Sequence, residues 1–331
     1  MSNLSLTLAI EDYDHVRDMM FGRVKPKGID LTFLNFQVEE TFFRFANAYE
    51  WEVSELSFAK FCSLRSLEDS PIVGIPVFVS RMFRHSAFYI RTDGKIKTAA
   101  DLKGGRIGVP EWTQTATVYA RGWLHHEGGA PLDSVEWVQG GVNEPGRKEM
   151  GKAKLPDGIK YSEVQDRSLA DLLLAGELDA VISARPPDAF LANDGKMQRL
   201  MPNYPEVELE YFRRTGVYPI MHTVAIKRDV YKKNPWIAMN LLTAFEEAKA
   251  KMVERLSDIN VSRIPFPWMP DSFEKMSQEF FPHGDYWPYG IENNRPTLET
   301  FLQYCDEQGV TRRKMTPEDL FAKETLSAFK V

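Results

Sequence analysis

The sequence predicts an α/β protein with two lobes and a ligand cleft between them. The chain has 331 residues, of which 43% are hydrophobic, which is enough for more than one core. Strand and helix patterns alternate in the first third, an order typical of a mostly parallel sheet. Two later extended segments, 85–91 and 218–226, are expected to link the lobes. Loops at the carboxyl ends of strands would face the cleft.

The first lobe is predicted from apolar runs and from apolar residues at helical spacing. These patterns predict strands over 4–10, 28–36 and 72–79, helices over 13–21 and 39–51, and a strand followed by a helix over 53–64.

The second lobe follows near residue 92. Its patterns predict a strand after Gly104–Gly105, a helix over 116–126 with Thr113 or Thr115 as N-cap, a strand over 135–138, a polar loop over 143–161, a helix over 168–176 and a strand over 178–183. The chain then returns through 218–226 to a helix over 235–256, an aromatic loop and two terminal helices. We therefore assign 1–90 plus 220–331 to lobe 1 and 91–219 to lobe 2.

Composition excludes several classes of function. The net charge is −6 and no run of four basic residues occurs, so no nucleic-acid surface is expected. The apolar runs are too short to span a bilayer, and the N-terminal segment does not resemble a secretory signal, so we expect a cytoplasmic protein without a membrane partner. Cys62 and Cys305 have no metal-ligand spacing, and a reduced pair is the simpler interpretation, although a disulfide stays open.

No familiar cofactor or nucleophile motif is present. The sequence lacks GxGxxG, Walker, GxSxG and HExxH patterns. Nothing in the spacing therefore indicates a cofactor or a metal, although His85, His222 and a carboxylate could still bind a metal in three dimensions.

A cationic cluster, RMFRHS, follows the apolar run PIVGIPVFVS. Arg81 and Arg84 are candidate carboxylate ligands because guanidinium stays charged and binds carboxylates in a bidentate manner. Arg185, which follows a buried strand, is a third candidate. The alternative for each arginine is an ion pair with a nearby acidic side chain.

His85 and His222 are the catalytic candidates among titratable side chains, because imidazole titrates near neutral pH. Each lies in a predicted linking strand, so the two rings are expected to flank one ligand. The alternative is a hydrogen-bonded core histidine. His15 is a weaker third candidate, and His125 with His126 is expected at the surface.

Acidic and polar residues complete the predicted site. Glu55 is a candidate proton donor or phenol acceptor, with a first-turn helix carboxylate as the alternative. Asp12 and Tyr13, after the first strand, are candidate substrate contacts, and Asp12 could instead cap a helix. Four residues at a helix start are candidates for binding a carboxylate, with an ordinary capped helix as the alternative: Trp112, Thr113, Gln114 and Thr115.

Several segments carry a family resemblance. AADLKGGRIGVP and GELDAVISARPP resemble the type II periplasmic-binding-protein fold. More of the chain, including RMFRHS, PIMHT and PYGIENN, resembles the 4,5-dihydroxyphthalate decarboxylase family over nearly its whole length. The resemblance implies a cofactor-independent decarboxylase on a binding-protein fold, with 3,4-dihydroxybenzoate as the product.

The decarboxylation of 4,5-dihydroxyphthalate requires groups of the kinds that the candidate residues offer. Direct loss of carbon dioxide would leave an unstable aryl carbanion, whereas protonation of the ring carbon avoids it. The site then needs cations for two carboxylates, an acid for the ring carbon and an acceptor at the para hydroxyl. The alternative is a solute-binding protein that captures an aromatic carboxylate without chemistry. A homo-oligomer is left open.

Overall fold

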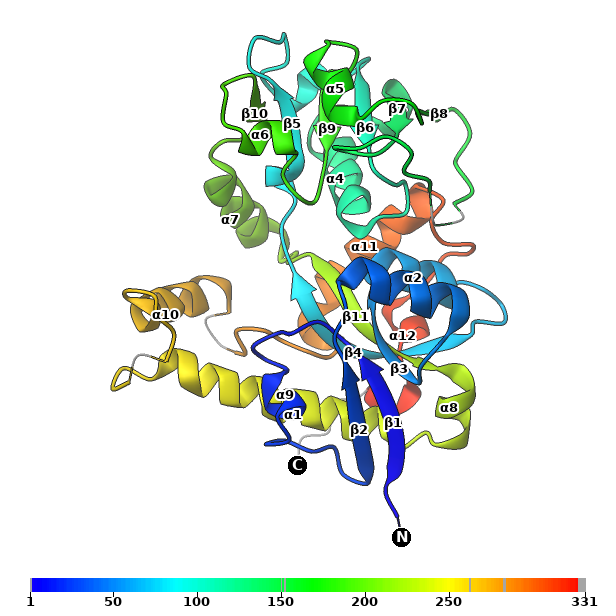
Figure 1. Cartoon of the computed structure of the whole chain (residues 1–331), viewed down its shortest axis with the longest axis vertical. Helices are drawn as coiled ribbons and strands as arrows, with labels where there is room; N and C mark the ends of the chain where they lie inside the picture. Colours follow the sequence, from blue (N-terminus) through cyan, green and yellow to red (C-terminus); the bar gives the residue numbers. More distant parts are fainter. Residues whose placement is uncertain (1, 150, 152, 262, 282–283, 327–331) are drawn as a thin grey trace. The chain divides into compact units, whose positions relative to one another are not determined.

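The computed structural model describes residues 2–149, 151, 153–261, 263–281 and 284–326. The chain divides into two compact units (Figure 1). Unit 1 comprises 1–81, 220–298 and 316–331, and unit 2 comprises 82–219 and 299–315. Residues 82–90 and 299–315, which the sequence analysis placed in lobe 1, belong to unit 2.

Unit 1 is built on a five-stranded sheet in the order β2-β1-β3-β11-β4. Its strands are β1 (Leu4–Ala9), β2 (Ile29–Leu34), β3 (Val53–Ser57), β4 (Ile72–Arg81) and β11 (Ile220–Lys227). β1 is parallel to β2 and β3, whereas β11 is antiparallel to both β3 and β4. The layer is thus mixed rather than mostly parallel, because the strand that returns from unit 2 runs against its neighbours.

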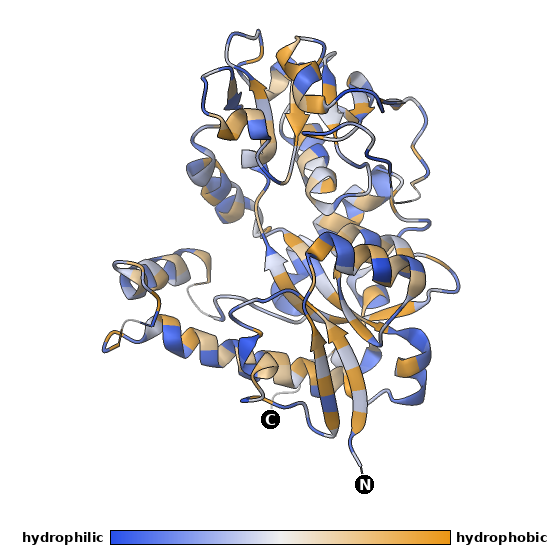
Figure 2. Cartoon of the chain, viewed as in Figure 1, coloured by the Kyte–Doolittle hydropathy of each residue, from blue (hydrophilic) through white to orange (hydrophobic). Residues whose placement is uncertain are grey.

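Several helices pack on this sheet, and α10 packs on α9. The helices of unit 1 are α1 (Arg17–Met20), α2 (Val38–Ala48), α3 (Phe58–Arg65), α8 (Arg228–Lys233), α9 (Ile237–Ser257), α10 (Met269–Phe280) and α12 (Pro317–Leu320), with 3-10 turns η4 (Glu292–Asn294) and η5 (Lys323–Thr325). α2 contacts β3, α3 contacts β11, and α9 contacts β4 and α1. Figure 2 shows the polar character of α8, in contrast to the mostly apolar strands.

Gly74 shows how closely the sheet of unit 1 is packed. A β-carbon at this position in β4 would lie 2.4 Å from the Phe61 ring and 2.9 Å from Phe321. Both aromatic rings are buried, and their stacked centroids lie 6.0 Å apart. The apolar run that precedes the cationic cluster therefore forms a core strand whose glycine makes room for aromatic side chains.

Unit 2 contains a six-stranded sheet in the order β10-β5-β9-β6-β7-β8. The strands are β5 (Phe88–Arg91), β6 (Arg106–Val109), β7 (Glu136–Gln139), β8 (Lys160–Glu163), β9 (Ala180–Ile182) and β10 (Met197–Arg199). β5 is antiparallel to β9 and β10, and the remaining pairs are parallel. β8 begins at the end of the segment that was predicted to be a loop.

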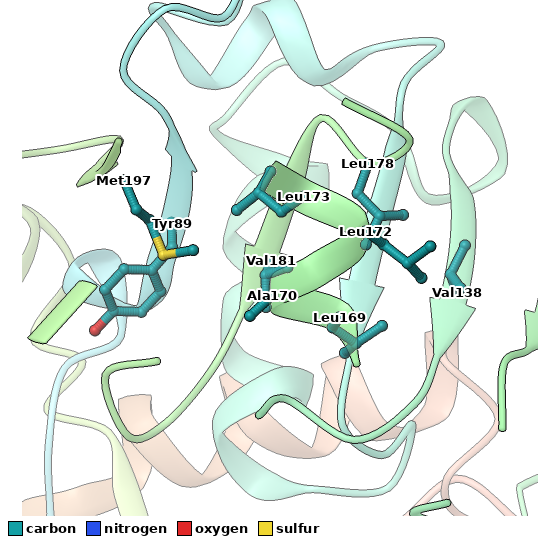
Figure 3. Close-up of a cluster of buried hydrophobic side chains, with 9 residues drawn as sticks. All are labelled: Tyr89, Val138, Leu169, Ala170, Leu172, Leu173, Leu178, Val181 and Met197. Atoms are coloured by element: carbon teal, nitrogen blue, oxygen red, sulfur yellow. The ribbon is translucent and has the colours of Figure 1, made fainter. Parts of the chain in front are cut away.

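The helices of unit 2 are α4 (Thr115–His126), α5 (Leu169–Leu174), α6 (Asp188–Leu191), α7 (Tyr204–Thr215) and the larger part of α11 (Arg295–Glu307), with 3-10 turns η1 (His85–Ala87), η2 (Ala99–Leu102) and η3 (Leu132–Ser134). Figure 3 shows α5 packing Leu169, Leu172 and Leu173 among residues that include Val181 and Val138. Burial of each such leucine side chain contributes about 1.5–3 kcal/mol.

The contact between α4 and the 299–315 segment explains its place in unit 2. A β-carbon at Gly122 would lie 2.2 Å from the Tyr304 ring, so the glycine permits a close approach. Tyr119 and Phe301 bring their ring centroids to 4.4 Å. No local pattern in the sequence of either segment predicts these long-range contacts.

Among the described helices, none combines the length and apolar character that a bilayer crossing requires. The cytoplasmic location expected from the sequence stays a prediction.

Candidate functional site

A buried carboxylate in unit 1 joins three parts of the chain. Glu55, on β3, is fully buried, and its Oε1 accepts a hydrogen bond from the Tyr13 hydroxyl at 2.6 Å. The same oxygen lies 2.6 Å from Nδ1 of His222, and Oε2 accepts from the backbone N–H of Glu11 at 2.9 Å. The structure thus brings together three of the residues that the sequence analysis selected: Tyr13, Glu55 and His222.

Strand register creates this arrangement. β1 pairs with β3 through Leu8–Val53 and Ala9–Ser54, so the chain leaving β1 passes beside Glu55. β11 pairs with β3 on the other side, and its register against β4 shifts both before and after His222. Such bulges often redirect a side chain at a functional site.

The hydrogen-bonding pattern fixes the orientation of His222. A carboxylate oxygen accepts hydrogen bonds, so the hydrogen of the contact with Glu55 belongs to Nδ1. Nε2 is then the nitrogen that can meet a ligand. The His222 side chain is 18% exposed, and Phe42 packs edge-on against its ring at 4.8 Å. A histidine held in this way can exchange a proton through Nε2.

Tyr13 supports the pair as a neutral donor. Burial raises the pKa of its phenol far above the usual value, and the charge of Glu55 acts in the same direction. A hydrogen bond with the Ser80 side chain opposes that shift. The Tyr13 phenol therefore stays protonated, and its hydroxyl donates a hydrogen bond to the carboxylate oxygen that also contacts His222.

Aromatic and cationic groups extend the cluster. The His15 ring lies 5.4 Å from Tyr13 and 5.6 Å from Trp287. The Trp287 indole donates to the Phe78 carbonyl at 2.8 Å, and buried Lys249 donates to the Trp287 carbonyl at 3.0 Å. Trp287, which lies in the aromatic loop that the sequence predicted after the helix over 235–256, is therefore held beside His15.

Arg81 belongs to the packing of unit 1. Its Nη2 donates to the Pro288 carbonyl at 2.8 Å and to the Asn294 side chain. Its guanidinium also lies 5.2 Å from the Phe78 ring centroid and 5.8 Å from that of Trp287. The side chain is 5% exposed. These contacts anchor the aromatic loop, and the role of Arg81 in binding a carboxylate stays a prediction.

His85 lies in unit 2, whereas His222 lies in unit 1, so their facing arrangement stays a prediction. The His85 ring packs edge-on against Trp123 at 4.8 Å and Tyr211 at 5.2 Å. Its Nδ1 is 3.7 Å from Glu208, and neither ring nitrogen has a hydrogen-bond partner within the described ranges. The adjoining cavity, about 10 Å³, is of the size that one water molecule needs.

The remaining predicted arginines also lie in unit 2. Arg84 donates to the Ala184 carbonyl at 3.3 Å, and burial lowers its pKa to about 10 while Glu208 opposes the shift. Arg84 therefore stays a cation at neutral pH. Arg185 is exposed, and its backbone carbonyl accepts from Ser183 at 2.6 Å.

An internal carboxylate occupies the predicted anion position in unit 2. Glu149 accepts from the Trp112 backbone N–H, from the Thr113 N–H at 3.3 Å and from the Thr113 hydroxyl at 2.5 Å. Arg121, fully buried, donates to the Trp112 carbonyl at 2.5 Å, and burial lowers its pKa to about 9. The backbone at 112–113 thus binds a carboxylate, and in this structure it is the chain's own.

Two predictions about helix caps are wrong. The N-cap of α4 is Gln114 rather than Thr113 or Thr115, and its side chain accepts from Thr117 at 3.0 Å. Asp12 does not cap α1, whose N-cap is Val16. Asp12 instead forms a 2.6 Å ion pair with Arg17, the first residue of α1.

Replacement of Glu149 by alanine is expected to lower the free energy of unfolding by about 1–3 kcal/mol, because the donors at 112–113 lose their acceptor. Urea denaturation measures this loss. Glu144→Ala, which changes an exposed carboxylate in the same segment, is the matched control. Equal stability of the two variants would contradict the role of Glu149.

One group of possible metal ligands lies in unit 2, away from the predicted residues. The ligand atoms of His125, His126 and Glu307 lie within 4.8 Å of one another. His126 Nε2 is 2.7 Å from Glu307, and His125 Nδ1 accepts from the Leu132 N–H at 3.3 Å. His126 Nε2, Glu307 and His125 Nδ1 thus each have a hydrogen-bond partner within the protein.

The buried His15 predicts a pH dependence of stability. Burial and, next, the positive charge of Lys249 lower its pKa from 6.5 to about 4. Between these values the unfolded chain binds a proton that the folded chain does not, so stability falls as pH falls, by up to about 3 kcal/mol.

Urea denaturation from pH 7 to 4 checks this expectation. His15→Gln, which does not titrate, is expected to lose less stability than the unmodified chain over the same interval. Identical pH profiles for the two proteins would contradict a neutral, buried His15.

Sequence reasoning missed Glu149 and Lys249 and underrated His15. The position of His15 just after the first strand was a usable signal, since such loops often carry function. Glu149 lay in a polar segment with several acidic residues and no distinguishing pattern. Lys249 lay on a helix whose apolar pattern indicated burial only for its neighbours.

Comparison with known proteins gives the family. No family model matches the chain. It is 34% identical to 4,5-dihydroxyphthalate decarboxylase of Comamonas testosteroni over the full length of both, and 40% identical to the Pseudomonas putida enzyme of that name over 60% of this chain and 78% of the relative.

Solved structures give the fold. The aliphatic sulphonate binding protein SsuA of Escherichia coli matches with a TM-score of 0.54 at 12% identity, covering 100% of this chain and 96% of SsuA. The desulfurization enzyme DSZB matches with a TM-score of 0.52 at 18% identity, covering 98% of each chain. The fold is thus periplasmic-binding-protein-like, as predicted, and the chain belongs to the 4,5-dihydroxyphthalate decarboxylase family.

Proposed function

We propose that this protein decarboxylates 4,5-dihydroxyphthalate, or a close dihydroxy aromatic dicarboxylate, to 3,4-dihydroxybenzoate and carbon dioxide. Membership of the family supports the substrate class. The observation that carries the chemistry is the buried carboxylate of Glu55, which holds Tyr13 and His222 at 2.6 Å.

The reaction needs a proton at the ring carbon that bears the leaving carboxylate. Each carboxylate of this substrate is para to a hydroxyl, which donates electrons as the ring carbon is protonated. The protonated ring then loses carbon dioxide, and the electron pair of the broken carbon–carbon bond restores aromaticity. One proton is consumed, and one carbon dioxide is released, for each substrate.

His222 is the proposed proton donor. In its imidazolium form it donates from Nδ1 to Glu55 and presents the second proton on Nε2. The carboxylate of Glu55 balances the positive charge of the ring, and solvent returns the proton after turnover. Glu55 acts through His222 and is therefore a positioning residue.

Tyr13 has a supporting role in this scheme. Its hydroxyl shares the Glu55 oxygen with His222 and lies 3.2 Å from Nδ1. Donation from Tyr13 helps to hold the carboxylate of Glu55 in the position from which it accepts the hydrogen bond of His222 Nδ1. Tyr13 thereby helps to orient the His222 ring.

We further propose that the chemistry runs on side chains alone, without a metal or cofactor. The other candidates, Arg81, Arg84, Arg185, Asp12 and residues 112–115, stay predicted contacts of the substrate. His85 stays a predicted catalytic residue.

The rival function is capture of an aromatic carboxylate without chemistry. Similarity in fold to sulphonate-binding proteins favours it, although a fold does not determine a function. The two functions differ in a single observable, the release of carbon dioxide.

The test incubates purified protein with 4,5-dihydroxyphthalate, with and without a chelator, and measures carbon dioxide and 3,4-dihydroxybenzoate. We expect equal release of both products under both conditions. Binding without release would support the rival function. Loss of turnover with chelator would overturn the metal-free mechanism and direct attention to His125, His126 and Glu307.

A further inference from the structure

One buried polar atom in unit 1, Nε2 of His15, takes no part in the mechanism proposed above. The side chain of His15 is enclosed between Tyr13 and Trp287, at ring distances of 5.4 and 5.6 Å, and the residue is 9% exposed. Its Nε2 is buried and, over the part of the chain that the structure describes, has no hydrogen-bond partner. An unsatisfied buried atom of this kind needs an explanation.

The opposite side of the ring fixes the tautomer. A hydrogen bond with the backbone of Val79 raises the pKa of His15. A hydrogen bond has this effect when the ring N–H donates to a backbone carbonyl oxygen. Since Nε2 has no partner, Nδ1 carries this hydrogen. A neutral imidazole has one N–H, and Nε2 therefore presents a lone pair.

The surrounding charges keep the ring neutral. The positive charges of Lys249 on α9 and Arg81 on β4 lower the pKa of the ring, whereas Glu55 on β3 and the hydrogen bond with Val79 raise it. Burial adds the largest contribution, and together these influences lower the pKa to about 4. At neutral pH His15 cannot attract a carboxylate as a cation, nor can it donate from Nε2. The ligand group that suits Nε2 is a hydroxyl, because a hydroxyl donates a hydrogen bond to a nitrogen lone pair.

We propose that Nε2 of His15 accepts a hydrogen bond from a ring hydroxyl of the substrate and thereby selects hydroxylated phthalates over phthalate. This inference rests on the proposed function for the identity of the ligand. It assigns the acceptor that the reaction requires at the para hydroxyl. Tyr13 lies near both groups, with its ring 5.4 Å from the His15 ring and its hydroxyl 3.2 Å from Nδ1 of the proposed donor, His222.

The proposed acceptor also fits the proton balance. As His222 protonates the ring carbon, the para hydroxyl becomes strongly acidic and its proton can move onto Nε2 of His15. Departure of carbon dioxide rearomatises the ring and leaves a phenolate, which takes that proton back. No oxidant or additional reactant is involved, and the net proton still comes through His222.

Two substitutions separate the two sides of the imidazole. His15→Asn keeps an amide donor near Nδ1 for the Val79 carbonyl and removes the acceptor at Nε2. His15→Gln reaches the Nε2 position with an amide oxygen and keeps an acceptor there. The pair differs by one methylene, so general destabilisation affects both.

The experiment measures the affinity of each protein for 4,5-dihydroxyphthalate and for phthalate by calorimetry, in a His222→Gln background in which turnover is expected to be slow. With His15 present, the hydroxylated ligand is expected to bind about 10- to 100-fold more tightly. His15→Asn is expected to abolish this preference without weakening phthalate binding, and His15→Gln is expected to retain part of it. A preference that survives His15→Asn would overturn the proposal.

A second measurement does not depend on any variant of His15 folding. Nitrogen-15 spectra of histidine-labelled protein at pH 7 are expected to show one neutral Nδ1–H ring whose Nε2 signal shifts with 4,5-dihydroxyphthalate and not with phthalate. An imidazolium, or an Nε2–H tautomer, would overturn the inference. If the selectivity appears but the unmodified protein releases no carbon dioxide, the proposed function fails while the role of His15 stands.

Discussion

Replacement of Glu55 by glutamine is expected to lower kcat by about 10²- to 10⁴-fold, the usual contribution of positioned acid–base catalysis. Glutamine keeps the size of the side chain, but its neutral amide cannot balance the charge of an imidazolium at His222. KM is expected to change little, because Glu55 is fully buried and acts through His222.

Tyr13→Phe is the matched control for this prediction. It removes the 2.6 Å hydrogen bond to Glu55 while it leaves the carboxylate and His222 in place. We expect a smaller loss of kcat from Tyr13→Phe than from Glu55→Gln. A Glu55→Gln enzyme with the kcat of the unmodified protein, or one whose loss lies entirely in KM, would contradict the proposed charge balance.

Replacement of Arg81 by methionine is expected to lower the free energy of unfolding by about 2–4 kcal/mol, because buried acceptors lose a charged donor. The Pro288 carbonyl and the Asn294 side chain both accept from this guanidinium, and the rings of Phe78 and Trp287 lie against it. Denaturant unfolding measures the effect.

Arg17→Met provides the comparison for Arg81. Arg17 pairs with Asp12 at 2.6 Å, but its side chain is 42% exposed, and such a surface pair contributes about 0–1 kcal/mol. Equal losses for the two variants would show that the buried contacts of Arg81 add no stability. A loss of ligand affinity in Arg81→Met without loss of stability would support its predicted role as a carboxylate ligand.

The sequence predicted elements better than it predicted contacts. The apolar run before RMFRHS is β4, and Glu55 and His222 lie on β3 and β11 as the extended patterns indicated. Their hydrogen bond depends on which strands are neighbours and on a bulge around His222. Neither feature has a local signature, so the residues could be selected one by one but not joined into a cluster.

The residues and segments that the sequence analysis missed or misplaced also depend on long-range contacts. Glu149 reaches back to Trp112 and Thr113 from a segment that reads as a loop, and no local pattern distinguishes it from other exposed acidic residues. The terminal segment 299–315 packs with α4 through long-range aromatic contacts, so its unit could not be assigned from periodicity. What sequence patterns capture is burial and local geometry, whereas these contacts connect distant segments.

The most direct test of the account compares carbon dioxide release from carboxyl-labelled 4,5-dihydroxyphthalate by the unmodified protein and by His222→Gln, at concentrations at which both are saturated. We expect release by the unmodified protein and a loss of about 10²-fold or more in the variant. Release by His222→Gln at the unmodified rate, or binding by the unmodified protein without any release, would contradict the claim that His222 delivers the proton.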